Sequence, residues 1–169
     1  VSKGRVLVDG VDVRDYIQKD LRDKIGFVPQ QALLFSGTIR DNMNFGKPNS
    51  TDEEIRSALE VAQAARFVSK KENGFEAEVS QGGKNFSGGQ KQRLAIARAL
   101  IKKPEIYIFD DSFSALDFKT DIRLRTALKQ YTKQASVIIV AQRVSSIMDA
   151  DNILVLNEGK IVGQGKHQE

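Results

Sequence analysis

The chain has 169 residues, of which 40% are apolar and 28% charged, and its formal net charge is +4. This size and composition are typical of one globular domain with its own core, and no stretch reaches the roughly 18 apolar residues of a membrane-spanning helix. With no cysteine and a single histidine, His167, the sequence excludes disulfides and thiol chemistry and disfavours a histidine-based site. The basic residues are interspersed with acidic ones and lack interleaved aromatic residues, so we expect no nucleic-acid partner.

The first 28 residues are predicted to form a hairpin, a short helix and a short strand. Apolar and polar residues alternate over 5–13 around an Asp-Gly pair, which is a typical hairpin turn. Residues 16–24 have a helical pattern, and residues 25–28 form a short strand that ends at Pro29 and Gln30.

Residues 51–71 are predicted to be helical. Thr51 and Glu54 have the spacing of a capping box, in which each side chain bonds the other residue's backbone N–H. Apolar residues recur over 55–62 at i, i+3, i+4 and i+7, which predicts a helix with one buried face. A shorter helix is predicted over 65–71.

A second helix start lies at 87–90, where the sequence is Ser-Gly-Gly-Gln. The serine and glutamine again have the capping-box spacing, and the glycines leave N–H groups uncovered at the positive end of the helix dipole. Such a helix end is a ready anion site. Apolar residues at 94, 97 and 101 predict one inward face, and Pro104 ends the helix.

Residues 106–109 and 137–140 are apolar without polar alternation, which predicts two interior strands of a parallel sheet. Asp110 and Asp111 follow the first strand, at the carboxyl edge where open α/β sheets bind ligands. A helix over 120–131 and a closing hairpin over 153–163 are also predicted.

Several of these segments resemble, in order, the motifs of ABC-transporter ATPase domains. Residues 85–93, NFSGGQKQR, are similar to the signature motif usually written LSGGQ, and residues 106–111 resemble the Walker B strand. Residues 114–117 resemble the D-loop, and residues 34–42, LFSGTIRDN, resemble the segment after the Q-loop in exporter-type members. The resemblance covers nearly the whole chain. It implies an α/β P-loop NTPase (RecA-like) core with a mostly parallel sheet, a helical signature subdomain and a remnant of an antiparallel β subdomain.

The phosphate-binding pattern of this family, G-x-x-x-x-G-K-[ST], is not found in the sequence. No Gly-Lys pair has a glycine five positions before it or a Ser or Thr after it. We therefore expect an N-terminally truncated domain that lacks the P-loop strand and helix, with that strand expected beside 106–109. Within the domain, 1–169, we expect the antiparallel remnant and a core strand at 1–28. The Q-loop and helical subdomain are expected at 29–103, and the Walker B, D-loop and switch region at 104–169.

The resemblance also implies a role for each site residue. In this family two domains sandwich two ATP molecules with Mg²⁺, each between the Walker B of one domain and the signature of the other. Asp110 would support Mg²⁺, Gln30 would sense the metal and the attacking water, and Asp111 would stand in for the catalytic base. Asp117 would contact the opposite domain. The signature residues that would close over the partner's ATP are Ser87, Gly88, Gly89 and Gln90.

Asp111 and Gln142 depart from the family pattern. Asp111 stands where most members have Glu, and misplacing a catalytic group by about 1 Å can lower the rate on the order of 10²-fold. Gln142 replaces the switch histidine and can neither carry charge nor relay a proton. We therefore expect a degenerate ATP site in a heterodimeric exporter of the multidrug or peptide type. The homologous partner subunit would carry Glu and His, the transmembrane domain would be fused upstream, and the domain would lie at the cytoplasmic face of the cell membrane.

Two other functions remain open at this point. One is a soluble ABC-type ATPase of DNA repair or translation, which the exporter-like segment at 34–42 disfavours. The other is a module that clamps ATP without hydrolysing it, which Asp111 and Gln142 favour for this chain's own site. A phospho-accepting receiver domain is excluded, because the Asp110-Asp111 pair lacks the third acid and the lysine that such a site needs.

Overall fold

The computed structural model describes residues 3–168, so the first two residues and the last residue of the expected domain lie outside it. The strands of this range are β1 (Leu7–Val8), β2 (Val11–Asp12), β3 (Ile25–Val28), β4 (Gly37–Thr38), β5 (Glu78–Val79), β6 (Ile106–Asp110), β7 (Ser136–Val140), β8 (Ile153–Asn157) and β9 (Lys160–Gly165). The α-helices are α1 (Gln18–Asp23), α2 (Ile39–Gly46), α3 (Asp52–Val61), α4 (Ala65–Val68), α5 (Gly88–Ile101) and α6 (Phe118–Tyr131). Short 3-10 helices are η1 (Gly74–Glu76), η2 (Gln81–Gly83) and η3 (Val144–Ser146).

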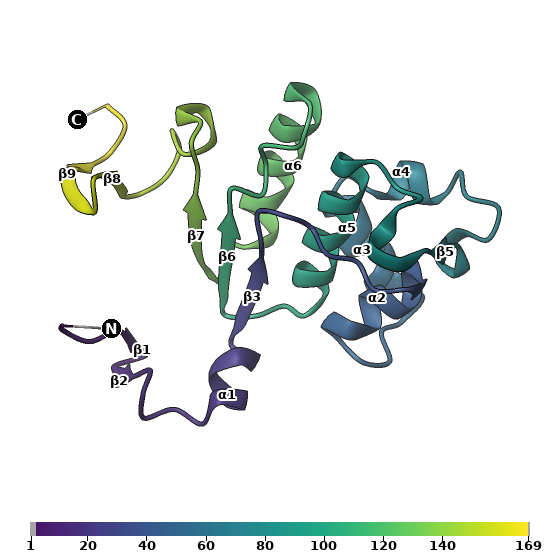
Figure 1. Ribbon diagram of the computed structural model, residues 1–169, viewed down its shortest axis with the longest axis horizontal. Coiled ribbons are helices and arrows are strands. Elements are labelled where there is room, and N and C mark those ends of the chain that lie inside the picture. The colour runs from purple at the N-terminus through teal and green to yellow at the C-terminus, as the bar shows by residue number, and fades with distance from the viewer. Residues whose placement is uncertain (1–2, 169) are drawn as a thin grey trace.

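A three-stranded parallel sheet in the order β3-β6-β7 lies at the centre of the fold (Figure 1). Ile25 pairs with Ile106, and Ile106 pairs with Ser136 on the other side, so the three strands start level and end at the same edge. The α/β class with a parallel sheet is therefore confirmed. Tyr107 and Phe109 are buried on one face of β6, whereas Ile106 and Ile108 are only half-buried.

The prediction that the missing P-loop strand lies beside residues 106–109 is wrong. β6 has a hydrogen-bonded neighbour on both sides, so a further strand cannot add beside residues 106–109. β7 was expected to be an interior strand, but in the described chain it pairs only with β6. Val137, Ile138 and Val140 are consequently exposed. An apolar run indicates that a strand is built to be covered, but it does not say which segment covers it.

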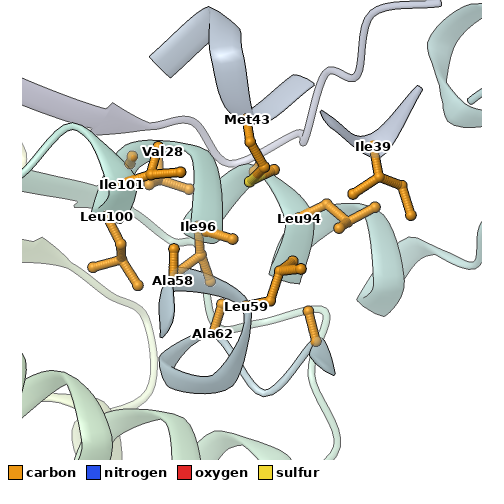
Figure 2. Close-up of a cluster of buried hydrophobic side chains, with 14 of the residues drawn as sticks. Val28, Ile39, Met43, Ala58, Leu59, Ala62, Leu94, Ile96, Leu100 and Ile101 are labelled. Atoms are coloured by element: carbon orange, nitrogen blue, oxygen red, sulfur yellow. The ribbon is translucent and has the colours of Figure 1, made fainter. Parts of the chain in front are cut away.

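The hydrophobic core is organised around α5, which lies between the sheet and the helices α2 and α3 (Figure 2). Side chains from the three neighbours converge on it: Val28 from β3, Ile39 and Met43 from α2, and Ala58 and Leu59 from α3. The expectation of a single inward face on α5 is too narrow. Eight of its residues are buried, as is typical of a helix that is surrounded on most sides: Gln92, Leu94, Ala95, Ile96, Ala97, Ala99, Leu100 and Ile101.

The two predicted capping boxes are confirmed. At the start of α5, the Ser87 hydroxyl accepts a hydrogen bond from Gln90 N at 3.3 Å, and Gln90 Oε1 accepts one from Ser87 N at 3.0 Å. Thr51 and Glu54 make the same reciprocal pair at the start of α3. Each pair satisfies two N–H groups that a helix start otherwise leaves unpaired.

Small antiparallel pairs lie outside the central sheet. The two predicted hairpins, β1-β2 and β8-β9, are confirmed, and α1 forms within the predicted range 16–24. β4 and β5 pair across the helical region, which the sequence did not predict. Among the described helices, none is both long and apolar enough to span a bilayer.

Candidate functional site

The carboxyl edge of the parallel sheet brings together four of the predicted site residues: Gln30, Asp110, Asp111 and Gln142. Asp110 is the last residue of β6, Gln30 follows β3, and Gln142 follows β7. Gln30 Nε2 donates a hydrogen bond to Asp111 Oδ2 at 3.2 Å. Gln30 and Asp111, which were expected to sense the metal and to stand in for the catalytic base, are therefore in direct contact, although they lie 81 positions apart in the sequence.

Asp111 has an uncommon backbone conformation that the structure holds on several sides. Its φ is 44°, in the left-handed region that residues other than glycine rarely adopt. Asp111 N donates to Val140 O at 2.8 Å, and its own carbonyl accepts from the Ser114 hydroxyl at 2.8 Å. The buried hydroxyl of Ser112 donates to Val28 O at 2.8 Å. Both neighbouring strands thus fix the turn after β6, in the way that strained residues at functional sites are usually maintained.

Asp117, the residue predicted to contact the opposite domain, is the N-cap of α6. Its Oδ1 accepts a hydrogen bond from Thr120 N at 3.0 Å. Hydrogen bonds from Thr120 lower the pKa of Asp117, with a smaller contribution from the charge of Arg93. The carboxylate therefore stabilises the start of α6 in addition to any role outside this chain, and the residue remains exposed.

The segment that follows Gln142 is tied to the D-loop and to α6. Gln142 itself is exposed, but Arg143 Nη2 donates to Ser114 O at 3.2 Å. Arg125 of α6 donates to Ser145 O at 2.7 Å and is held by the buried carboxylate of Asp121. These positioning contacts were not predicted from the sequence, because they join segments whose proximity no local pattern records.

The signature residues lie at the exposed N-terminus of α5, beside the D-loop. Ser87 and Gly88 are exposed, and a Cβ added at Gly88 would meet no heavy atom within 4 Å. A Cβ added at Gly89 would lie 3.2 Å from Ala115 O, which is closer than an ordinary contact. No hydrogen bond or ion pair of the described chain joins residues 87–90 to Asp110 or Asp111. The signature and the sheet edge are therefore two separate groups of residues within one chain.

An exposed aromatic patch lies near the Q-loop. The rings of Phe35 and Phe45 pack at a tilt with centroids 4.3 Å apart, and the Arg98 guanidinium lies over both rings. Phe45 is 69% exposed and Leu33 60% exposed. Arg98 donates to Leu33 O at 2.8 Å, and burial lowers its pKa. Arg98 Nη1 is buried and has no hydrogen-bond partner among the described residues, so the patch holds a donor that its own chain does not use.

The residues at the sheet edge could bind a divalent cation only if a bound ligand supplied further coordinating atoms. Residues 3–168 contain no cluster of three or more potential metal-binding His, Cys, Asp or Glu side chains. Mg²⁺ in nucleotide sites is commonly held by one or two protein groups together with substrate phosphates and water. Asp110, with Gln30 beside the same edge, fits this mode.

Three features together define the class of ABC-type nucleotide-binding domains. They are a parallel sheet with a Walker B-type strand, a Q-loop residue at the edge of this sheet, and a capped signature helix. A sequence profile described as "ABC transporter" matches residues 1–114, which is more than half of the chain. The chain belongs to the ABC transporter family. This family binds ATP and couples its hydrolysis to transport.

Relatives and a solved structure agree with this assignment. An uncharacterised ABC transporter ATP-binding protein of Mycobacterium tuberculosis (strain ATCC 25618 / H37Rv) is 50% identical over 171 residues, covering 99% of this chain and 29% of the relative. An ATP-dependent lipid A-core flippase of Desulfotalea psychrophila is 40% identical over 169 residues, covering 100% of this chain and 30% of the flippase.

The structure of a bacterial Atm1-family ABC exporter with ATP bound matches with a TM-score of 0.94 and 38% identity, over 98% of this chain and 29% of that chain. The predicted family and the P-loop NTPase fold class are thereby confirmed. The present chain spans less than a third of the length of the proteins that it matches.

Proposed function

We propose that this chain is the nucleotide-binding domain of an ABC exporter in which ATP binding and hydrolysis drive transport across a membrane. Within it, we assign residues 1–28 to the antiparallel remnant and a core strand, 29–103 to the Q-loop and helical subdomain, and 104–169 to the catalytic core. The names of the flippase and of the Atm1-family exporter support an exporter over a soluble ATPase. Recovery of the full-length protein with membranes, rather than with nucleic acid, tests this choice.

The observation that carries the proposal is the uncovered N-terminus of α5. Gly88 does not have a positive φ, and no heavy atom lies within 4 Å of the place where a Cβ would be. Nothing within the described chain therefore requires glycine there, although alanine is a better helix former. Glycine at such a point permits an anionic ligand to approach the free N–H groups closely. We infer that this ligand is the ATP bound by a homologous partner subunit.

This chain's own ATP site is proposed to be degenerate. Asp110 and Gln30 would hold Mg²⁺, which supplies charge neutralisation of the phosphates when it is bound with ATP. Asp111 would orient the attacking water, but its carboxylate is one methylene shorter than that of the usual Glu. Gln142, at the end of β7, can donate and accept hydrogen bonds but cannot carry a proton or a charge. We therefore expect slow hydrolysis at this site.

A sound signature beside a weakened catalytic pair favours an asymmetric heterodimer. In a homodimer, each ATP site would combine one intact half with one weakened half. In a heterodimer, residues 87–90 would instead complete a site that is built on the partner's Glu and His, and that site would perform most of the turnover. The weakened residues Asp111 and Gln142 would then be confined to the other site.

The aromatic patch is proposed to contact the transmembrane domain at the cytoplasmic face of the membrane. Leu33, Phe35 and Phe45 are exposed apolar side chains next to the Q-loop segment, and such clusters commonly mark protein contacts. The Arg98 guanidinium lies over both rings and supports the patch from within the chain. The proposed contact to the transport machinery would then lie close in sequence to Gln30.

A pair of matched substitutions in the assembled transporter tests the asymmetric arrangement. Asp111→Asn here is expected to lower steady-state ATP turnover only modestly. Substitution of the partner's catalytic Glu by Gln is expected to lower it by on the order of 10²-fold, because that group orients the water at the active site. Equal losses from the two substitutions would contradict the asymmetric model and would leave the assignment as an exporter domain in place.

A second candidate is a domain that binds ATP at its own site without hydrolysing it. The same two residues, Asp111 and Gln142, favour it. Single-turnover hydrolysis in a complex whose partner site is inactivated distinguishes the two candidates. Slow release of phosphate from the remaining site supports a degenerate ATPase, and its complete absence supports a non-hydrolysing module.

A further inference from the structure

Gln92 is a polar residue buried within the apolar body of α5. It is 2% exposed, and the helix residues that follow it are mostly buried and apolar. A buried amide is unfavourable unless it is hydrogen-bonded. Gln92 Nε2 donates to Pro29 O at 3.2 Å, across 63 positions of sequence. The side chain therefore connects the signature helix to the residue directly before the Q-loop glutamine.

The Pro29 carbonyl is a point at which the orientation of the Q-loop can be set. Proline has a fixed φ, so a hydrogen bond to its carbonyl restrains the peptide plane that leads into Gln30. The Gln30 side chain in turn donates to Asp111 Oδ2 at 3.2 Å. Two hydrogen bonds and one peptide unit thus join α5 to the carboxylate at the sheet edge.

We propose that Gln92 is a positioning residue that couples the two ATP sites to which this chain contributes. The inference rests on the proposed function, in which residues 87–90 complete the partner's site and Gln30 belongs to this chain's own site. Gln92 is two positions beyond Gln90 in the same helix, so it moves with the signature. A displacement of α5 as the signature closes over the partner's ATP is passed through the Pro29 carbonyl to Gln30.

The coupling is measurable in the full-length transporter with its partner subunit. The readout is the release rate of a fluorescent ATP analogue from this chain's site, with the partner's site either filled or disabled by substitution of its P-loop lysine. In the unsubstituted complex, filling the partner's site is expected to slow release by at least about fivefold, the lower end of typical allosteric coupling. In Gln92→Met, which keeps the length but removes the donor, this ratio is expected to fall to within about twofold of one.

A matched control removes a different buried hydrogen bond. Thr132 is buried in the segment after α6, and its hydroxyl donates to Leu128 O at 2.8 Å, so Thr132→Val loses a comparable bond away from the Q-loop. It is expected to keep the full ratio. If Gln92 had a merely structural role, Gln92→Met would change both release rates by the same factor and the ratio would be preserved. That outcome overturns the proposal. An unsubstituted complex whose release rate ignores the partner's site overturns it as well.

Hydrogen exchange separates this inference from the proposed function. Without nucleotide, Gln92→Met is expected to raise amide exchange at Gln30 and Gln31 relative to the unsubstituted protein and to Thr132→Val. Unchanged exchange at these amides overturns the positioning role, whether or not the complex hydrolyses ATP. Absence of any ATP turnover in the unsubstituted complex counts against the proposed function alone.

Discussion

Replacement of Gly88 by alanine is predicted to change stability and turnover in opposite directions. Gly88 is the first residue of α5, it does not have a positive φ, and an added Cβ would meet nothing within 4 Å. Alanine is a better helix former, and it also restricts the unfolded chain, so we expect a stabilisation of about 0.5 kcal/mol. For a domain of this size, that raises the midpoint of thermal unfolding by roughly 1–2 °C.

The added methyl group would occupy the space that we assign to the partner's nucleotide. A displacement of the phosphates by about 1 Å is expected to lower ATP turnover on the order of 10²-fold. The assay is steady-state ATP hydrolysis by the assembled transporter, with scanning fluorimetry of the same preparation as the measure of stability. Normal turnover by Gly88→Ala would show that no ligand approaches this helix end, and the assignment of the signature would fail.

Gly46→Ala is the matched control, because the same chemical change meets a different environment. A Cβ at Gly46 would lie 2.2 Å from the Arg98 carbonyl oxygen, where α2 crosses α5. That oxygen belongs to a buried helix and cannot move aside as a flexible side chain would. Overpacking of this kind costs about 1–3 kcal/mol, so Gly46→Ala is expected to lower the unfolding midpoint by several degrees.

Three further predictions concern the signature, the D-loop and the exposed patch. Gly89→Asp is expected to abolish ATP turnover, because the carboxylate repels the partner's phosphates and its Cβ presses on Ala115 O, while the protein still folds; near-normal turnover would contradict this. Hydrogen bonds from Thr120 hold the pKa of Asp117 below its unfolded value of about 3.9, so this contribution to stability is present above that pH and is lost as the pH falls through the folded pKa. Acid titration of the unfolding midpoint should show a shallower decline in Asp117→Asn. Phe45→Ser is expected to leave the unfolding midpoint nearly unchanged, since the residue is 69% exposed, and to lower substrate-stimulated ATP turnover of the assembled transporter, because it weakens the proposed contact with the transmembrane domain.

The local features of the fold were predictable from the sequence because their causes are local. The capping boxes at Thr51 and Ser87 and the hairpin turns at residues 9–10 and 158–159 depend on residues a few positions apart. The capping box at the start of α2 has the same cause, in the reciprocal bonds of Thr38 and Asp41, and was simply missed.

Apart from this capping box, the features that were missed or wrong depend on contacts between distant segments. The strand at 137–140 has the composition of an interior strand, yet its neighbours follow from topology and not from its own residues. The left-handed conformation of Asp111 is held by its bond to the end of β7 and by the bond of the next residue, Ser112, to the end of β3. Arg125 and Gln92 look like ordinary polar helix residues until the fold places Ser145 and Pro29 beside them. Long-range positioning of this kind leaves no periodic signal in the sequence.

The geometry of α5 explains why one helix can serve several functional elements. Its 14 residues extend about 21 Å, and burial on most sides makes it move as one body. The signature lies at its N-terminus, Gln92 holds the Q-loop from its first turns, and Arg98 supports the aromatic patch nearer its C-terminus. A tilt that adjusts the signature by a fraction of an ångström must therefore also shift the supports of the Q-loop and the patch. In the proposed dimer, a conformational change at the partner's ATP would reach both this chain's own site and its proposed docking surface through that helix, without needing a separate relay for each.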